Sequence, residues 1–334
     1  MTPHRPILWI GLVAWMAAAT AAAQPGTRLT DQAGRRLTVA RPFERIISLY
    51  GAHTENLFAL GAGAALIGVA RHDDYPPEAQ QKPVFSYHDG LERFLAAGPD
   101  LVLIRPMIDR GYAPLVQGLE KHGVTVVSLQ PATVEAMYEY WRALGLLTGR
   151  QAQAEAQVAA FRQAVQAFRE LTRGVHARRR VYFEAIHKRM KTFMPGSMPI
   201  FALETAGGIN IAADARQVRN TNIAFYGKER IMRRGPEIDV YLAQRGTMNP
   251  VTIAQIRAEP GFSVVAAVRN DRICIVDEVL VARPTRRLLA GIDQIGRCLY
   301  PDIFETEGQR VLDRAGLIRS PVRVPGHKAR RNTP

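Results

Sequence analysis

A stretch of forty residues without proline, residues 133–172, constrains the fold of this chain more than any other feature. It is rich in Ala, Gln, Glu, Arg and Leu, and only Gly145 and Gly149 interrupt it. Such a composition is typical of helix, and at about 1.5 Å per residue one continuous helix would reach ~60 Å, longer than a lobe is wide. The sequence therefore predicts a long helical segment with a kink or short break near residues 146–149.

Short apolar runs alternate with helical patterns on both sides of this segment. Residues 29–39 alternate around Ala33 and Gly34 in the manner of a small hairpin, and Thr54 is the predicted N-cap of a helix. The predicted strands are residues 45–49, 66–69, 101–104, 124–129, 180–186, 237–242 and 273–276, and the predicted helices are residues 54–60, 91–97, 112–122, 200–206, 251–258 and 286–300. Strands that alternate with helices indicate parallel sheets covered on both faces. We therefore predict two α/β lobes joined by one long helix.

The first 23 residues predict export. Arg5 precedes an apolar run, and small residues end it at Ala23. This order is typical of a cleavable signal peptide, which places the mature protein in the periplasm. A retained anchor is the alternative, although the run is at the lower limit for crossing a bilayer of ~30 Å. Because the residue directly after Ala23 is Gln24 and not a cysteine, a lipid-anchored form is not expected.

The charge of the chain does not indicate a nucleic-acid partner. The formal net charge is +14, from 44 Lys and Arg against 30 Asp and Glu. Five of the cations lie in residues 319–334, a segment without acids that is predicted to be disordered. Export and the lack of a recognition motif argue against nucleic acid, so most of this charge is interpreted as a solvated basic surface.

Motifs of catalysis are missing from the sequence. There is no Gly-x-Ser-x-Gly turn, no phosphate-binding loop of the Walker type and no His-Glu-x-x-His helix, so neither an enzyme nor a resident cofactor is predicted.

An oxidising compartment permits a disulfide between Cys274 and Cys298. We favour the other interpretation, in which these are two separate buried thiols.

Four segments carry a resemblance to a known family. They are RIISLYGAHTENLFALGAG at residues 45–63 with LIGVA and DYP after it, GLERFLAAGPDLVL at 90–103, ETAGGINIAA at 204–213, and KERI through PEID at 228–239. In this order, with the helical segment between the second and third, the chain resembles the periplasmic binding proteins that deliver iron–siderophores, haem and vitamin B12 to ABC importers.

The resemblance implies an architecture. It is the class III periplasmic binding protein fold, α/β, with two Rossmann-like lobes that have central parallel sheets and a single long linker helix, which limits closure on binding. The implied divisions are a signal peptide at 1–23, an N-terminal lobe at 24–131 with the Fe/B12-binding domain starting near 44, the linker at 132–174, a C-terminal lobe at 175–318 and the basic tail at 319–334.

Ligand-contacting residues are expected in loops that follow strands, because ligands of open α/β sheets bind beyond the carboxyl ends of the strands. A helix start explains Thr54 and Glu55 but not their neighbours, and the resemblance puts an aromatic ligand contact near Tyr87. A cluster of three cations also follows the strand predicted to end at residue 186. The candidates are Tyr50, His53, Arg71, Tyr87, Arg105, His187, Lys188, Arg189, Lys191, Arg219 and Arg283.

Capture and release of a metal chelate is the expected function. Ferric siderophore is the first candidate, because arginine and lysine complement an anionic ligand. A corrinoid such as vitamin B12 is the alternative, followed by haem with Tyr50, Tyr87 or His53 as axial ligand. Bare-metal binding through His53, His72, His88 and His187, or a non-transport role in the envelope, also stays open.

The expected partners are the permease dimer of an ABC importer and its ATPase subunits, with the chain itself a monomer. In the relatives one glutamate on each lobe pairs with arginines of the permease. Glu92 and Glu229 match those positions here, and each begins a predicted helix after a glycine. A carboxylate also stabilises a helix N-terminus, which is the structural alternative for each residue.

Overall fold

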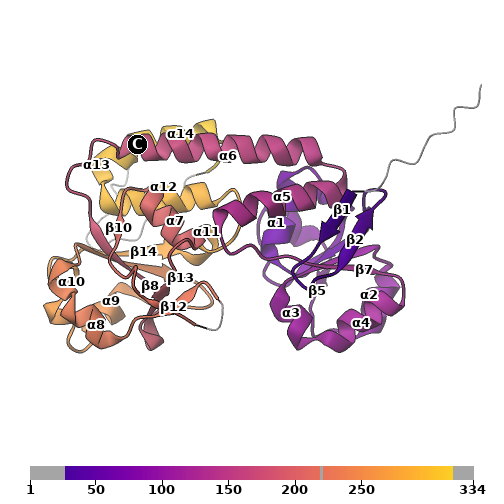
Figure 1. Ribbon diagram of the computed structural model, residues 1–334, viewed down its shortest axis with the longest axis horizontal. Coiled ribbons are helices and arrows are strands. Elements are labelled where there is room, and N and C mark those ends of the chain that lie inside the picture. The colour runs from indigo at the N-terminus through magenta and orange to yellow at the C-terminus, as the bar shows by residue number, and fades with distance from the viewer. Residues whose placement is uncertain (1–26, 219–220, 319–334) are drawn as a thin grey trace, which may run out of the picture.

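The computed structural model describes residues 27–218 and 221–318, which form two α/β lobes side by side (Figure 1). The signal peptide predicted at residues 1–23, the tail at 319–334 and Arg219 lie outside the described residues. Within the described residues, no helix combines the length and the apolar character needed to span a bilayer. The predicted domain boundaries stay predictions.

The N-terminal lobe contains a five-stranded sheet in the order β5-β4-β3-β6-β7, and every neighbouring pair is parallel. Its strands are β3 (Ile46–Ser48), β4 (Leu66–Ala70), β5 (Val84–Phe85), β6 (Leu101–Ile104) and β7 (Thr125–Ser128). Its helices are α1 (Gly51–Ala59), α2 (Leu91–Ala97), α3 (Pro106–Gly111) and α4 (Ala113–Lys121), with 3₁₀ turns at Gly63–Ala65 and Pro77–Gln81. All four residues of β6 are buried, as expected for a central parallel strand covered on both faces.

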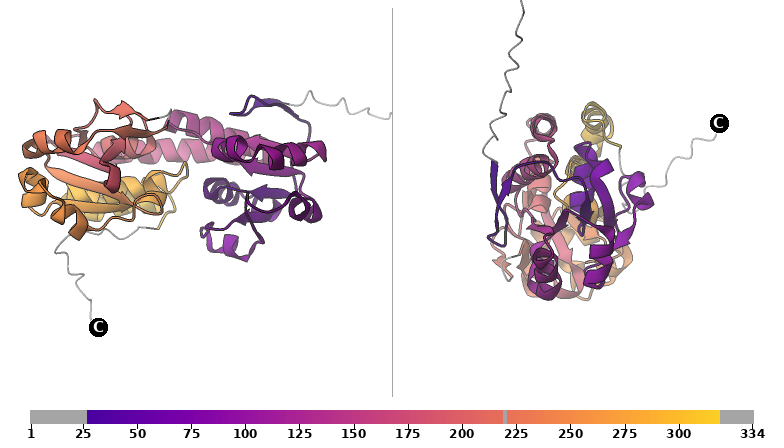
Figure 2. Two further views of the ribbon diagram at one scale, coloured as in Figure 1. Left: turned by 90° about the horizontal axis from the view of Figure 1, so that it is seen from below. Right: turned by 90° about the vertical axis from the view of Figure 1, so that its right-hand side faces the viewer.

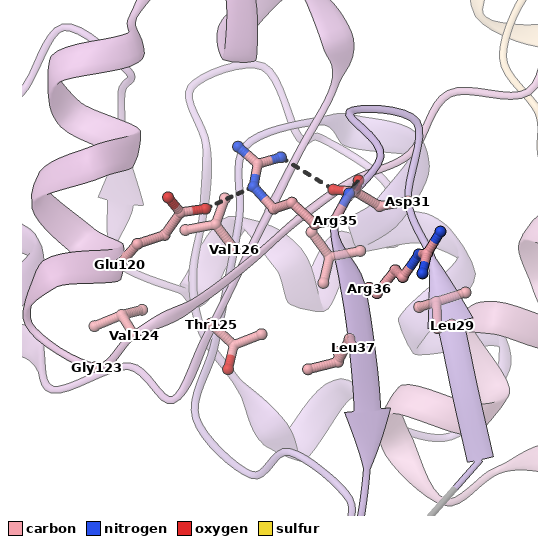
Figure 3. A pocket seen from close by; sticks show the side chains of 11 residues that line it. Leu29, Asp31, Arg35, Arg36, Leu37, Glu120, Gly123, Val124, Thr125 and Val126 are labelled. Carbon is pink, nitrogen blue, oxygen red and sulfur yellow. Dashed lines mark hydrogen bonds and ion pairs between the residues drawn. The ribbon is translucent and has the colours of Figure 1, made fainter.

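The predicted hairpin is present as β1 (Thr27–Thr30) and β2 (Arg36–Val39). Arg35 attaches it to the lobe, because its guanidinium contacts Asp31 at 3.0 Å, Asp109 at 2.6 Å and Glu120 at 2.6 Å. Figure 3 shows Arg35 between Asp31 and Glu120, beside a cavity of about 310 Å³. One arginine therefore fastens the hairpin to α3 and α4.

Helix α1 begins earlier than predicted. It starts at Gly51 and its N-cap is Tyr50, so the prediction that Thr54 caps the helix is wrong. The Thr54 hydroxyl lies 2.5 Å from Asp73 Oδ2 and 2.8 Å from Ser48 Oγ instead. Thr54 thus ties the helix to the loop after β4.

The long helical segment is a hairpin of two helices, α5 (Val134–Thr148) and α6 (Gln151–Leu171). The predicted break is at Gly149, where φ is +67°, and it reverses the chain. As a result Arg142 reaches Glu155 at 2.7 Å across the hairpin. Helix α6 alone continues to the second lobe, where it packs on α12 and α14 (Figures 1 and 2). Its 21 residues span about 31 Å.

The C-terminal lobe has a mixed sheet in the order β11-β12-β9-β8-β13-β14, with β10 beside β8. Strands β8 (Arg180–Ile186), β13 (Val240–Arg245), β14 (Ile273–Asp277) and β10 (Ile209–Asn210) are parallel. Strands β9 (Lys191–Phe193), β12 (Ile223–Phe225) and β11 (Arg216–Gln217) extend the sheet in antiparallel fashion. The sequence pattern missed this extension because its strands are only two or three residues long.

The helices of this lobe are α7 (Met198–Thr205), α8 (Lys228–Arg233), α9 (Ile253–Ala258), α10 (Ala266–Arg269), α11 (Glu278–Val281), α12 (Leu288–Leu299), α13 (Pro301–Ile303) and α14 (Gln309–Arg314). A π-helical turn is at Phe304–Gly308, and 3₁₀ turns are at His187–Arg189, Gly235–Glu237 and Phe262–Val264. The predicted class, two α/β lobes with central parallel strands and one crossing helix, is confirmed.

One hydrophobic core runs through both lobes. It includes Leu101 in the first sheet, Trp141 and Phe168 in the helical hairpin and Phe183 in the second sheet, each with 0% exposure. Because burial of apolar side chains is the main favourable term in folding, this continuity couples the lobes strongly.

A polar contact also joins the lobes, at the segment between α11 and α12. The carbonyl of Pro284 accepts hydrogen bonds from Asn56 Nδ2 at 2.9 Å and Trp141 Nε1 at 3.2 Å. Arg287 binds both carboxylate oxygens of Glu55, at 2.8 and 2.7 Å. The C-terminal lobe is therefore fixed to α1 and α5 by contacts that do not depend on α6.

Candidate ligand-binding cleft

A cavity of about 840 Å³ lies between the two lobes. Loops that follow each of the five strands of the first sheet line one side, and loops after β13 and β14 line the other, together with Asn222 before β12. This placement agrees with the expectation that ligands of α/β sheets bind beyond the carboxyl ends of the strands. Five of the predicted residues line the cavity: Tyr50, Arg71, Tyr87, Arg105 and Arg283.

Three arginines from three different loops reach this cavity. The Arg105 guanidinium lies over the Tyr50 ring, 5.1 Å from its centroid. A Cβ atom on Gly51 would lie 2.8 Å from Arg283 Nη1 and 2.8 Å from Asp73 Oδ1, so glycine leaves room for both side chains. Arg71 is exposed at the end of β4. Within the described part of the chain, none of the three arginines forms an ion pair.

The carboxylates of the cavity, by contrast, have partners within the protein. Asp73 accepts from the Thr54 hydroxyl at 2.5 Å and from the Ala70 amide at 3.0 Å. Asp89 pairs with Arg93 at 3.0 Å, and Glu278 accepts from the Met248 amide at 3.0 Å. Since these acids are engaged and the arginines are not, the free hydrogen-bonding capacity of the cavity favours an anion.

The pKa values of two acidic groups in the cavity are raised, which favours their neutral, protonated forms. Burial raises the pKa of Asp73, although its hydrogen bonds and Arg283 oppose this effect. Burial likewise raises the pKa of Tyr50, against the influence of Arg105 and Arg283. At neutral pH the Tyr50 side chain is thus a phenol that can donate a hydrogen bond.

An aromatic cluster forms the rim on the N-terminal lobe. The Tyr87 ring centroid lies 4.5 Å from that of His88 and 4.6 Å from that of Tyr112. The Tyr112 hydroxyl is 3.2 Å from His88 Nδ1. Tyr87 and His88 line the cavity and offer flat surfaces to a ligand.

His53 does not reach the cavity. Its side chain is fully buried, with Nδ1 2.7 Å from the Tyr140 hydroxyl and Nε2 3.0 Å from the Ile104 carbonyl oxygen. Burial lowers the pKa of His53 to about 4. Because α1 starts at Gly51, residue 53 falls in its first turn and points into the lobe, which the predicted start at Thr54 did not anticipate.

The cationic cluster after β8 also lies outside the cavity lining. The chain turns back at once through His187–Arg189 into antiparallel β9, so Lys188 and Arg189 are exposed at the turn and Lys191 begins the next strand. The strand was correctly predicted to end at residue 186, but no loop toward the ligand follows it. Arg219 is outside the described residues.

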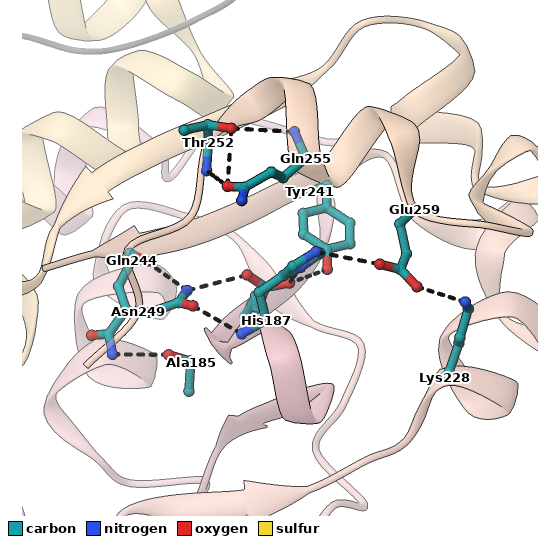
Figure 4. Close-up of polar contacts among 10 residues, drawn as sticks. Ala185, His187, Lys228, Tyr241, Gln244, Asn249, Thr252, Gln255 and Glu259 are labelled. Carbon is teal, nitrogen blue, oxygen red and sulfur yellow. Dashed lines mark hydrogen bonds and ion pairs between the residues drawn. The ribbon is translucent and has the colours of Figure 1, made fainter. Parts of the chain in front are cut away.

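His187 belongs to a separate polar network in the C-terminal lobe (Figure 4). Its Nδ1 lies 2.8 Å from Glu184, a fully buried carboxylate that also accepts from the Tyr241 hydroxyl at 2.5 Å. Its Nε2 lies 3.4 Å from Glu259, which pairs with Lys228 at 2.6 Å. The hydrogen bond with Glu184 raises the pKa of His187. This network holds the turn after β8, and none of its residues lines the cavity.

Sequence reasoning missed the lining residues Gly246, Thr247 and Met248, and also Glu278. The strand before them was predicted to end at 242, whereas β13 continues to Arg245. If the strand had been predicted to end at Arg245, the rule that loops after strands line the cleft would have identified residues 246–248.

The four histidines proposed for a bare metal are not brought together. His72 and His88 line the cavity, whereas His53 and His187 have the partners given above. Among the described residues, no group of three or more His, Cys, Asp or Glu side chains could hold a metal ion. Geometry therefore does not favour the bare-metal alternative.

Glu92 and Glu229 are both exposed in the first turn of a short helix, α2 and α8 respectively. These helices lie on the same side of the molecule, one in each lobe (Figure 1). The two carboxylates are therefore available to one partner that spans both lobes.

Comparisons with known proteins agree with this geometry. A family model described as periplasmic binding protein matches residues 46–280. An uncharacterised ABC transporter substrate-binding lipoprotein of Bacillus subtilis is 25% identical over 83% of this chain and 86% of its own length. A vitamin B12-binding protein of Vibrio cholerae is 26% identical over 80% of this chain and 94% of its own.

Solved structures show the same fold. That of a possible iron-binding periplasmic protein from Staphylococcus epidermidis is 27% identical, with a TM-score of 0.69 over 78% of this chain and 100% of the other. A periplasmic heme-binding protein from Roseiflexus, 23% identical, gives a TM-score of 0.62 over 81% of this chain and 99% of its own.

Proposed function

This chain belongs to the periplasmic binding protein family, and we propose that it captures an anionic metal chelate, of the ferric siderophore class, between its lobes and delivers it to an ABC importer. The proposed ligand class rests on one observation: the cations and the acids of the cavity differ in the partners that they have within the protein. Arg71, Arg105 and Arg283 have no ion-pair partner among the described residues, whereas Asp89 pairs with Arg93 and the other two acids of the cavity accept hydrogen bonds from hydroxyl or amide groups. Planar guanidinium groups suit carboxylate or catecholate oxygens.

A neutral corrinoid is the second candidate, and the aromatic rim favours it. Tyr87 and His88 line the cavity and form flat surfaces on which a macrocycle can stack, and Tyr112 packs against both. The vitamin B12-binding relatives are consistent with this alternative. Haem is the third candidate. His53 is engaged on both ring nitrogens, which leaves Tyr50 and Tyr87, both in the cavity lining, as the candidate axial ligands.

The proposal places the mature protein in the periplasm as a monomer that has no resident cofactor, since the metal is cargo. Transfer to the permease would use Glu92 and Glu229 as docking groups, one on each lobe. Two exposed ion contacts contribute little affinity each, but together they fix an orientation.

Direct titration separates the ligand classes. The purified protein is titrated by tryptophan fluorescence with ferric catecholate, ferric hydroxamate and ferric citrate, and with cyanocobalamin and hemin. We expect an anionic ferric chelate to bind most tightly, and Arg105→Ala with Arg283→Ala to weaken it by at least about tenfold, since hydrogen bonds to charged groups contribute ~1.5–3 kcal/mol each.

Arg178→Ala is the matched control, because this arginine is exposed and does not line the cavity. Its affinity should equal that of the unmodified protein. Tight binding of cyanocobalamin without binding of any ferric chelate would overturn the siderophore assignment and support the corrinoid. An absorption spectrum of the protein purified from its own host gives an independent identification of the ligand.

A further inference from the structure

An exposed row of side chains crosses the antiparallel edge of the C-terminal sheet. Lys191 in β9 is the cross-strand partner of Phe225 in β12, and Phe225 is the partner of Arg216 in β11. Directly opposed residues lie on the same face of an antiparallel sheet, so these three side chains are neighbours. Phe225 is 47% exposed and Arg216 is exposed at the edge strand.

This row adjoins Glu229. A Cβ atom built on Gly227 would lie 3.3 Å from the Phe225 ring and 3.8 Å from Glu229 Oε2, so the aromatic ring and the carboxylate flank the same glycine. Gly227 has φ +90°, a conformation that other residues rarely adopt, and a side chain at this position would crowd the Phe225 ring.

The surface formed by Lys191, Phe225, Arg216 and Glu229 has the composition of a protein interface. A large aromatic group lies between charges of both signs, and within the described residues neither the two cations nor the glutamate forms an ion pair. Exposed apolar groups bordered by unpaired charges are typical of protein-binding surfaces. None of these four residues lines the ligand cavity.

The N-terminal lobe has a smaller counterpart. Val84, at the edge strand β5, is 43% exposed, and its carbonyl accepts a hydrogen bond from Arg93, the residue that follows Glu92. Each lobe therefore has an exposed apolar side chain on an element that contacts the helix of its proposed docking glutamate or adjoins it in sequence.

We propose that Phe225, with Lys191 and Arg216, extends the docking contact of Glu229, and that its partner is the periplasmic surface of the permease. This inference rests on the proposed function. The permease surface would offer a basic group to Glu229, an apolar depression to Phe225 and a carboxylate to Arg216. An anionic bilayer suits the surface less well, because it supplies neither a fixed cation for Glu229 nor an apolar depression of fixed shape for Phe225.

Binding to the importer tests this inference. The importer of the same host is reconstituted in nanodiscs, and the affinity of the full chain for it is measured by biolayer interferometry. Phe225→Ser should weaken binding by about fivefold or more, as expected for an aromatic anchor, and Phe225→Tyr should retain it. Ile209→Ser is the control, because Ile209 is similarly exposed at 45% and lies away from this surface.

The outcomes distinguish the inference from the proposed function. Normal binding of Phe225→Ser together with weak binding of Glu92→Ala/Glu229→Ala overturns the role of Phe225 and leaves the proposed function standing. Normal binding of both variants overturns docking through this surface altogether. Nanodiscs of phosphatidylglycerol without importer are the lipid arm: a loss of binding for Phe225→Ser there, and not with the importer, would make the bilayer the partner.

Discussion

Removal of Arg287 should destabilise the whole protein, because this residue neutralises a buried carboxylate across the junction of the lobes. Glu55 is 4% exposed in its side chain and Arg287 is 16% exposed, and the guanidinium binds both carboxylate oxygens. Breaking a buried pair by removing one partner costs ~3–5 kcal/mol, mainly because a charge is left unpaired. Since Arg287 keeps some contact with solvent, we expect Arg287→Ala to lower the free energy of unfolding by about 3 kcal/mol.

Urea unfolding followed by circular dichroism measures this loss. Arg142→Ala is the matched control, because Arg142 also pairs with a glutamate at 2.7 Å, but Glu155 there is 59% exposed. An exposed pair contributes less than about 1 kcal/mol, so the control should be nearly as stable as the unmodified protein. The double variant Glu55→Gln/Arg287→Ala should regain part of the loss. An Arg287→Ala variant no less stable than Arg142→Ala would refute the reasoning.

Three further predictions concern other regions. Glu92→Ala/Glu229→Ala should leave the affinity for the chelate intact while uptake and ligand-stimulated ATPase activity fall; normal transport would leave both as helix-start residues. The pKa of His187 is raised in the folded state, so its contribution to stability is fully present below about pH 6.5 and is lost as pH rises through the folded pKa. Urea midpoints of the unmodified protein and His187→Gln should therefore converge as the pH is raised above about 6.5, and a constant difference would contradict this. Cys274 and Cys298 are not joined by a disulfide in the structure, so titration of the denatured, unreduced protein should find two thiols rather than none.

The lobes, the order of the elements and most of the parallel strands could be predicted from the sequence, because apolar runs and glycine stops are local signals. Strand ends could not be fixed as well. Extending β13 to Arg245 moves the ligand loop by three residues, and only pairing with β14 shows where the strand ends.

His53, Lys188 and Arg189 were predicted ligand contacts but do not line the cavity, because the orientation of a side chain depends on tertiary contacts. His53 lies in the right loop, but the earlier start of α1 turns its side chain into the lobe. Lys188 and Arg189 follow a central strand, yet pairing of β8 with β9 takes the chain back before it can reach the cleft. In the sequence, a strand followed by a three-residue turn into a second strand resembles a strand followed by a loop. The reversal at His187–Arg189 therefore could not be predicted.

The main hydrophobic core of this protein is shared by both lobes, so neither lobe contains all of it. Helix α12, near the end of the described chain, contributes Leu288 and Ile292 to the same core cluster as Ile46 in the first sheet strand. Contacts between residues so far apart in sequence carry a high loop-closure entropy and form late. A fragment that stops before α12 would leave apolar surface open on both sides of the helical hairpin. We therefore expect the two lobes, although each resembles a complete domain in outline, to unfold in one cooperative transition.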